Sequence, residues 1–276
     1  MQLQEKPFLF LHIPKTGGMT FHGIVRRQFF RAKRYTIVSN KHVTHWNGLE
    51  AAEKRKFGVV KGHFWWQGKD FHPEDAIHYT FLRDPAKRIT SHYYHVLPLR
   101  NRGEMLTQEF GQGHFSLKDL LLAGKFLRFD NCSVRFLSGN IDKPWDTIDD
   151  SDLQLAIKNF DEKFQHFGLQ ERYDESLMLL QYELGWKAPY YVSLNITGDA
   201  VRKEEEKFDA ETLQLIQHFS RFDRLLWEHG KKRFQEKLAL HGERLQRDVT
   251  RFQARNRKHV FLRSLYHRMF GLSSIQ

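Results

Sequence analysis

Three polar segments that directly follow apolar runs contain the residue types that bind phosphate groups or move protons. The first, residues 12–20, reads His-Ile-Pro-Lys-Thr-Gly-Gly-Met-Thr and separates the apolar run 8–13 from a helical pattern. A strand that turns through glycines into a helix presents backbone N–H groups to an anion. Two glycines, a lysine and two hydroxyls are the candidate ligands: Gly17, Gly18, Lys15, Thr16 and Thr20. The lysine precedes the glycines, unlike a standard P-loop, and a tight strand-to-helix connection is the open alternative.

The second segment follows the apolar run 77–82 and begins with Arg83. Asp84 followed by Pro85 predicts the start of a helix, with an acidic cap and proline in the first helical position. Ser91 then lies about two helical turns further on. A guanidinium and a hydroxyl in these places can bind one phosphate group. An ordinary capped helix with surface arginines is the alternative interpretation.

The third segment supplies a candidate base. His63 follows the apolar run 57–60 and the pair Lys61-Gly62. Imidazole titrates close enough to neutral pH to accept a proton from a reacting hydroxyl. The chain has sixteen histidines, so position decides which of them matters, and His63 stands at the end of a predicted strand.

Strands that alternate with helices must position these segments. Apolar spacing predicts helices over residues 117–129, 150–164, 174–184 with Asp174 as N-cap, and 209–240. Alternation of this kind predicts an α/β fold with a central parallel sheet flanked by helices. Ligands of such sheets lie beyond the carboxyl ends of the strands, so we expect the three segments to meet in one cleft.

The paired motifs resemble the donor-binding signatures of carbohydrate sulfotransferases, in the group that includes the heparan sulfate 2-O- and 6-O-sulfotransferases (sulfotransferase family 2). The similarity extends over most of residues 8–234. It implies a P-loop-like sulfotransferase fold and 3′-phosphoadenosine 5′-phosphosulfate (PAPS) as donor. The first segment would hold the 5′ side of PAPS, and Arg83 and Ser91 its 3′-phosphate. Met19 stands where the family has threonine, which removes one hydroxyl.

The resemblance also implies roles for residues outside these motifs. His63 matches the histidine of a Gly-His pair that serves as general base. Asn131, Arg135 and Glu171 fall in matching segments as candidate substrate contacts, although a structural salt bridge explains Glu171 equally well. Further positions near the adenosine are Asn195 and Thr197.

Together these residues predict in-line transfer of a sulfuryl group from PAPS to a hydroxyl, on a glycan or a glycolipid. His63 would take the proton of the hydroxyl, and Lys15 would offset charge on the leaving oxygen. No metal is expected, because no clustered metal-ligand spacing is visible. The rival hypotheses are a nucleotide-dependent kinase, a non-enzymatic protein that binds polyanions or membranes, and an inactive relative.

Positive charge is concentrated at the end of the chain. Residues 230–276 contain twelve Lys or Arg and three acids, and so carry nine of the eleven net positive charges. Apolar residues at helical spacing among them predict a basic amphipathic tail over residues 236–276, after a sulfotransferase domain over residues 1–235. Such a helix can touch an anionic membrane, steer an acidic acceptor or simply pack on the domain, and no specific nucleic-acid partner is expected.

Composition limits the class of protein to which the chain can belong and the cellular compartment that we expect for it. With 40% hydrophobic and 14% aromatic residues, the chain can fill a core, so disorder is not the default interpretation. The single cysteine and the lack of a long apolar stretch predict a cytoplasmic protein, at most at a membrane surface. The Golgi lumen is the alternative if the chain is a piece of a longer secretory-pathway enzyme.

Overall fold

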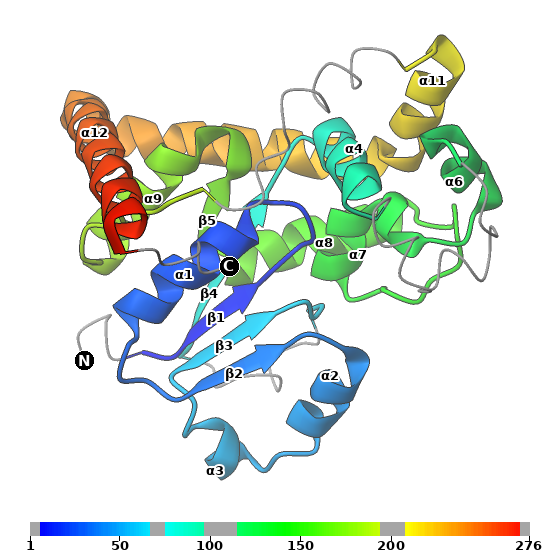
Figure 1. Cartoon of the computed structure of the whole chain (residues 1–276). Coiled ribbons are helices and arrows are strands. Elements are labelled where there is room, and N and C mark those ends of the chain that lie inside the picture. Colours follow the sequence, from blue (N-terminus) through cyan, green and yellow to red (C-terminus); the bar gives the residue numbers. More distant parts are fainter. Residues whose placement is uncertain (1–5, 67–74, 97–114, 194–207, 271–276) are drawn as a thin grey trace.

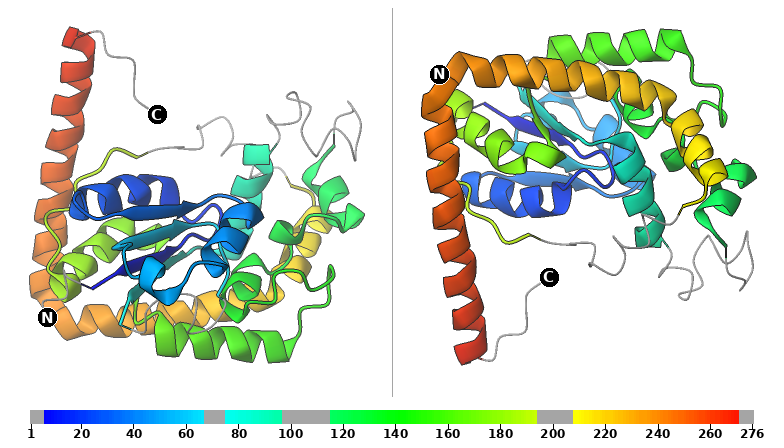
Figure 2. Two further views of the ribbon diagram at one scale, coloured as in Figure 1. Left: turned by 90° about the horizontal axis from the view of Figure 1, so that it is seen from below. Right: turned by 90° about the horizontal axis from the view of Figure 1, so that it is seen from above.

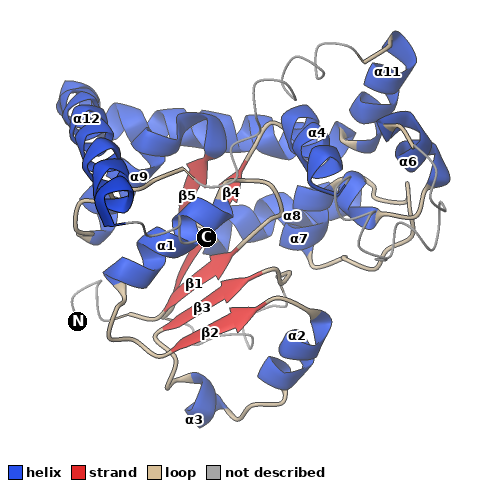
Figure 3. Cartoon of the chain, in the orientation of Figure 1, coloured by secondary structure: helices blue, strands red, loops and turns tan. Residues whose placement is uncertain are grey.

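The computed structural model of the chain contains a parallel sheet with helices on both faces (Figures 1 and 3). It describes residues 6–66, 75–96, 115–193 and 208–270. The sheet has five strands in the order β2-β3-β1-β4-β5. Their bounds are β1 (Phe8–Leu11), β2 (Arg34–Ile37), β3 (Val59–Gly62), β4 (Ile77–Leu82) and β5 (His166–Leu169). The predicted α/β class with a central parallel sheet is confirmed.

The helices and short 3₁₀ turns (η) fill the connections between the strands and the second half of the chain. They are α1 (Gly18–Gln28), α2 (Asn40–Asn47), α3 (Ala51–Lys54), α4 (Pro85–Val96), α6 (Leu117–Ala123), η4 (Leu127–Phe129), α7 (Cys132–Ser138), α8 (Asp150–Lys163), η5 (Gln170–Arg172), α9 (Tyr173–Leu184), α11 (Ala210–Phe219) and α12 (Arg221–Phe270). Among the described residues, no helix is long and apolar enough to cross a membrane.

Alternate side chains of β4 serve the two faces of the sheet, as the two-residue repeat of a strand requires. Tyr79 and Phe81 pack on Phe21 of α1, with ring centroids 4.9 and 5.1 Å apart. On the opposite face, His78 packs against Phe164 after α8, at 5.9 Å. Both faces are therefore covered, which explains why β1 is a continuous apolar run and why β4 is apolar except at His78 and Thr80.

Two helix starts hold each other in place beside the sheet. Asn131, which precedes α7, accepts the backbone N–H groups of Phe222 and Asp223 at the start of α12 (3.0 and 3.2 Å). In return, the Asp223 carboxylate accepts those of Ser133 and Val134 in α7 (3.1 and 2.8 Å). Each side chain thus caps the other helix, satisfying N–H groups that a helix leaves without partners.

The long α12 differs from the predicted helix over residues 209–240. Asp209 caps α11, as its side chain accepts the N–H of Thr212 (2.7 Å), and α11 ends before Ser220. From Arg221, α12 continues far beyond residue 240, with a break at Gly242 where φ is 54°. Its two halves run in different directions (Figure 2). The predicted domain boundary at residue 235 falls inside α12 and stays a prediction.

Two other local predictions need correction. Asp174 was expected to cap the helix 174–184, but Arg172 is the N-cap of α9, and Asp174 lies in its first turn. There its carboxylate accepts the Tyr191 hydroxyl at 2.7 Å. Strand β2 was not predicted, because it lies at the edge of the sheet and three of its four side chains are exposed or half-buried. An edge strand of this kind has no apolar run to mark it.

We expect Asp223→Ala to lower the free energy of unfolding by about 3–5 kcal/mol. The variant removes two cap hydrogen bonds. It also leaves the fully buried Arg88 guanidinium, whose Nε lies 3.7 Å from the Asp223 carboxylate, without its counter-charge. Urea unfolding would measure the loss. Glu228→Ala on the same helix is the control, since it breaks only an exposed pair with Arg224 and should cost less than about 0.5 kcal/mol. Equal losses in the two variants would contradict the cap.

Candidate active site

The three chemical segments stand on adjacent strands. Strand β1 lies between β3 and β4, and all three run parallel, so their carboxyl ends meet at one edge of the sheet. His63 Nδ1 lies 2.8 Å from the carbonyl oxygen of His12, which joins the end of β3 to that of β1. Arg83 Nη1 donates to the carbonyl of Lys15 at 2.9 Å, which joins β4 to the same loop. The structure thus brings the three segments together.

The loop before α1 has the backbone shape of an anion site. Lys15 and Gly17 both adopt left-handed conformations, with φ of 69° and 88°. The helix begins at Gly18, and no side chain caps it. Its first N–H groups therefore have no partner within the helix, and the helix dipole favours negative charge there. This geometry fits the phosphate or sulfate of a nucleotide donor.

The threonines of the loop differ in their surroundings. The Thr16 side chain is fully buried and donates its hydroxyl proton to the Ile13 carbonyl at 2.8 Å. Its hydroxyl therefore holds the loop together, contrary to the expectation that it offers a hydrogen bond to a ligand. Thr20, in the first turn of α1, is 8% exposed, whereas the neighbouring Met19 is 51% exposed.

Three histidines, His12, His22 and His63, form a cluster next to the Lys15 loop. The His12 ring stacks on His63 with centroids 4.3 Å apart, and its Nδ1 lies 3.1 Å from His22 Nε2. Glycine is required at position 18, because a Cβ there would lie 2.1 Å from His12 Nε2. Burial is the main cause that lowers the pKa of all three histidines, that of His22 to about 3. The cluster is therefore neutral at pH 7.

The contact with His12 fixes the tautomer of His63. A carbonyl oxygen only accepts, so Nδ1 must carry the proton and Nε2 keeps its lone pair. Burial lowers the pKa of His63 below its usual value, and the hydrogen bond to His12 partly offsets this effect. The positive charges of Arg128 and His95 lower it further. A half-buried imidazole that is neutral and holds a free Nε2 lone pair is equipped to accept a proton.

Lys15 is a cation in a place that disfavours positive charge. Burial, and then the neighbouring Arg83, lower its pKa to about 8. An anion bound in the loop would relieve both effects, because an opposite charge favours the protonated amine. Such a perturbed lysine beside unpaired backbone donors is typical of a functional site.

The start of α4 follows the predicted pattern. The Asp84 carboxylate accepts the N–H of Lys87 at 3.0 Å, and Pro85 is the first helical residue. Ser91 lies two turns on and is 6% exposed. Arg88, between them, has no exposed surface and pairs with Asp223, so this arginine anchors α4 to α12.

The predicted substrate contacts lie in structural networks. Arg135 is fully buried, where it pairs with the Asp130 carboxylate and donates to the carbonyls of Lys143 and Pro144. Asn131 is also fully buried, in the reciprocal cap described above. Neither side chain has exposed surface, so neither can contact an acceptor in this conformation.

The remaining predictions concern Glu171 and the two residues expected near the adenosine. The Glu171 carboxylate accepts the backbone N–H of Asp84 at 2.7 Å, and so ties the end of β5 to the start of α4. Asn195 and Thr197, the predicted neighbours of adenosine, lie outside the described residues.

Three residues that the sequence did not single out border the site. His95 and Arg128 are exposed and close enough to His63 for their charges to lower its pKa. Tyr173 opens α9, and its ring would lie 3.3 Å from a Cβ at Gly17. Of these three residues, only His95 has a recognisable pattern in the sequence, because it follows His92 by three residues on one predicted helix. Arg128 lies in a 3₁₀ turn, where no periodicity marks a facing residue.

Comparisons with known proteins were made on structure and on sequence. The structure is similar to that of a sulfotransferase from Alicyclobacillus acidocaldarius, with a TM-score of 0.38 and 13% identity, over 78% of this chain and 96% of that one. None of the curated proteins compared with the chain matches it. Residues 34–265 match the sequence model of the galactose-3-O-sulfotransferase family. The match includes His63, Arg83 and Ser91, and begins after the Lys15 loop.

The family match corrects the predicted compartment. Galactose-3-O-sulfotransferases are Golgi enzymes, so the prediction of a cytoplasmic protein is wrong. It rested on the single cysteine and on the lack of an apolar span. A folded domain in the lumen of the secretory pathway can share both features, because its core alone can stabilise it.

The match also decides how far the resemblance holds. The prediction of a carbohydrate sulfotransferase is confirmed, whereas the heparan sulfate group is not the family that matches. The chain is accordingly an enzyme that transfers sulfuryl groups, with a glycan as the type of acceptor. It belongs to the galactose-3-O-sulfotransferase family.

Proposed function

We propose that this enzyme transfers the sulfuryl group of PAPS to a glycan hydroxyl, with His63 as general base. The observation that carries the proposal is the hydrogen bond from His63 Nδ1 to the His12 carbonyl. It leaves Nε2 of a neutral imidazole available on the strand next to the Lys15 loop. Within the described ranges, no group of three or more His, Cys, Asp or Glu side chains could hold a metal. A kinase would need only one or two carboxylates for magnesium together with the nucleotide phosphates, so the nucleotide that binds separates the two mechanisms.

The donor would be held from two sides. Backbone N–H groups at the start of α1, the Lys15 ammonium and the Thr20 hydroxyl suit the 5′-phosphosulfate. Arg83, at the end of β4, and Ser91, two turns into α4, suit the 3′-phosphate. Arg83 already donates to the Lys15 carbonyl, so a hydrogen bond links the two halves of the proposed donor site.

The transfer step then follows from the charges. As the acceptor oxygen attacks sulfur, its proton passes to His63 Nε2, and the new O–S bond forms. The bond from sulfur to the bridging phosphate oxygen breaks at the same time. The ammonium of Lys15 stabilises the negative charge that develops on the leaving oxygen. The family name makes the 3-hydroxyl of galactose the first acceptor to test.

Binding of the product nucleotide, 3′-phosphoadenosine 5′-phosphate (PAP), tests the donor site. At a concentration 100 times its Kd, PAP should stabilise the protein by about 2.7 kcal/mol. Adenosine 5′-phosphate at the same concentration should stabilise it much less, because it lacks the 3′-phosphate. Ser91→Ala should weaken PAP binding about tenfold, since one hydrogen bond to a charged phosphate is lost. Thermal-shift titration would measure both effects.

Thr90→Ala is the matched control, because the Thr90 hydroxyl already donates to the Ala86 carbonyl. Its affinity for PAP should equal that of the parent protein. Stabilisation by magnesium and ATP, with none by PAP, would overturn the proposed donor and favour the kinase.

Removal of the base should affect chemistry and not donor binding. We expect His63→Gln to lower kcat roughly 100-fold to 10,000-fold, while PAP affinity changes less than about twofold. Turnover of PAPS with galactosides measures the first quantity, and thermal shift the second. The control His45→Gln replaces a histidine of α2 and should leave kcat unchanged. A His63→Gln variant with normal kcat would exclude His63 as the base.

The pH dependence of kcat/KM should be bell-shaped. The acid limb reports protonation of His63 and should lie below pH 6.5, because burial lowers the pKa of this histidine. The alkaline limb reports loss of the Lys15 proton in the free enzyme, near pH 8. Lys15→Arg, which stays charged over this range, should lack the alkaline limb even if its activity is low. An unchanged alkaline limb in this variant would contradict the role of Lys15.

A further inference from the structure

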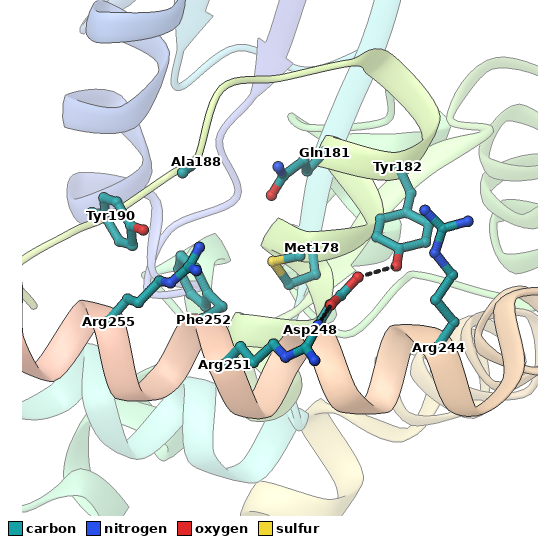
Figure 4. Close-up of a pocket in the computed structure, with 10 residues that line it drawn as sticks. All are labelled: Met178, Gln181, Tyr182, Ala188, Tyr190, Arg244, Asp248, Arg251, Phe252 and Arg255. Atoms are coloured by element: carbon teal, nitrogen blue, oxygen red, sulfur yellow. Dashed lines mark hydrogen bonds and ion pairs between the residues drawn. The ribbon is translucent and has the colours of Figure 1, made fainter.

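A pocket lies between α9 and the second half of α12 (Figure 4). Its volume is about 580 Å³. Side chains from both helices and from the segment after α9 line it: Met178, Gln181, Tyr182, Ala188, Tyr190, Arg244, Asp248, Arg251, Phe252 and Arg255. This volume lies within the range of small-ligand sites, and the lining is more polar than is usual for such sites.

The pocket and the donor loop contact different turns of α9. Tyr173, the first residue of α9, packs beside Gly17 of the donor loop. Tyr182, which borders the pocket, follows nine residues later, about 14 Å along the helix axis. At the other side of the pocket, Tyr190 precedes Tyr191, whose ring centroid lies 5.1 Å from that of Tyr173, so competition with the donor nucleotide has to be measured.

Positive charge faces into this pocket. Arg244, Arg251 and Arg255 project from one side of α12 around a single acid, Asp248 (Figure 4). That carboxylate is already engaged, since the Tyr182 hydroxyl donates to it at 2.6 Å and Arg251 lies 3.3 Å away. Within the described part of the chain, Arg244 and Arg255 form no ion pair. Both guanidinium groups are exposed, with that of Arg244 next to Tyr182, and their planar forks suit carboxylate and sulfate.

The walls of the pocket add flat aromatic surfaces. The Tyr190 ring is stacked parallel to Phe252, with centroids 5.7 Å apart. Arg244 lies over the Tyr182 ring at 5.7 Å. The aromatic face and the guanidinium groups can contact the apolar face of a sugar ring and its acidic substituent together, because the two kinds of group line the same cavity.

The pocket is held in place by contacts behind it. The backbone N–H of Tyr191 donates to Asn256 at 2.8 Å, and Gln253 donates to Asp174 at 3.0 Å. Leu245 and Val249 of α12 are buried in the main core. A site supported in this way loses little freedom when it binds a ligand.

We propose that this pocket binds an anionic saccharide, a sugar that carries a carboxylate or a sulfate group, separately from the donor. The stacked rings of Tyr190 and Phe252 beside the guanidinium groups favour a sugar over a lipid surface, because a sugar offers an apolar ring face and an acidic substituent together. The site would hold an acidic part of a glycan chain on the enzyme. That biological meaning rests on the proposed function, whereas the binding itself requires no transfer reaction.

Calorimetric titration at 150 mM salt with a heparin-derived hexasaccharide tests the pocket. The parent protein should bind this probe and not the neutral hexasaccharide maltohexaose. Arg244→Gln combined with Arg255→Gln should weaken binding at least about tenfold, because two charge-assisted contacts are lost. The matched control is Arg247→Gln combined with Arg257→Gln, which removes the same charge from the same helix outside the pocket. It should change the affinity less than about twofold.

Four results would overturn the proposal. Equal losses in the two double variants would indicate diffuse attraction to a basic helix. Competition by PAP would place the hexasaccharide in the donor cleft, and equal binding of maltohexaose would remove the need for an anion. Binding of phosphatidylserine vesicles that depends on Arg244 and Arg255, without hexasaccharide binding, would assign the arginines to a membrane. Failure of PAP to stabilise the protein would instead overturn the donor proposal and leave this pocket standing.

Discussion

The hydrogen bond between His63 and the backbone of His12 is possible only because β3 and β1 are parallel neighbours. The His12 carbonyl, after β1, accepts this hydrogen bond and so keeps a proton on Nδ1 of His63, after β3. The same backbone then turns into the Lys15 loop, whose carbonyl receives Arg83 from β4. Candidate base, anion-binding turn and guanidinium are therefore aligned by the sheet itself. Loss of that strand order would separate all three.

Prediction from sequence worked where a single physical signal dominates. Strand β4 was predicted with its observed bounds, since a strand buried on both faces is mostly apolar. The Lys15 loop, His63 and Arg83 were found because polar residues directly after such strands must lie at one edge of the sheet. Strand β2 and Arg128 escaped because an edge strand and a 3₁₀ turn carry no comparable pattern.

The predictions for Asn131 and Arg135 illustrate a different difficulty, because both side chains are buried and paired in the structure. A buried polar network and a binding site use the same residue types, and a sequence does not show which groups are already paired. Here Asp130 and Asp223 supply the partners. These contacts anchor α7 to α12, and Arg88 adds α4 to the same network. Polar residues next to the cleft thus stabilise the helices that surround it.

The break at Gly242 lets the two halves of α12 pack against different parts of the domain. Before it, Gly230 lets α12 cross the sheet closely, since a Cβ there would lie 2.6 Å from Leu82. After it, the helix changes direction and places its arginines along the outer side of α9 (Figures 2 and 4). Nine of the eleven net positive charges of the chain lie after Gly230. This charge borders the far end of α9, while the charges that suit the donor come from the loops at the strand ends. The two places proposed to bind anions are therefore set apart by the point at which one glycine bends the helix.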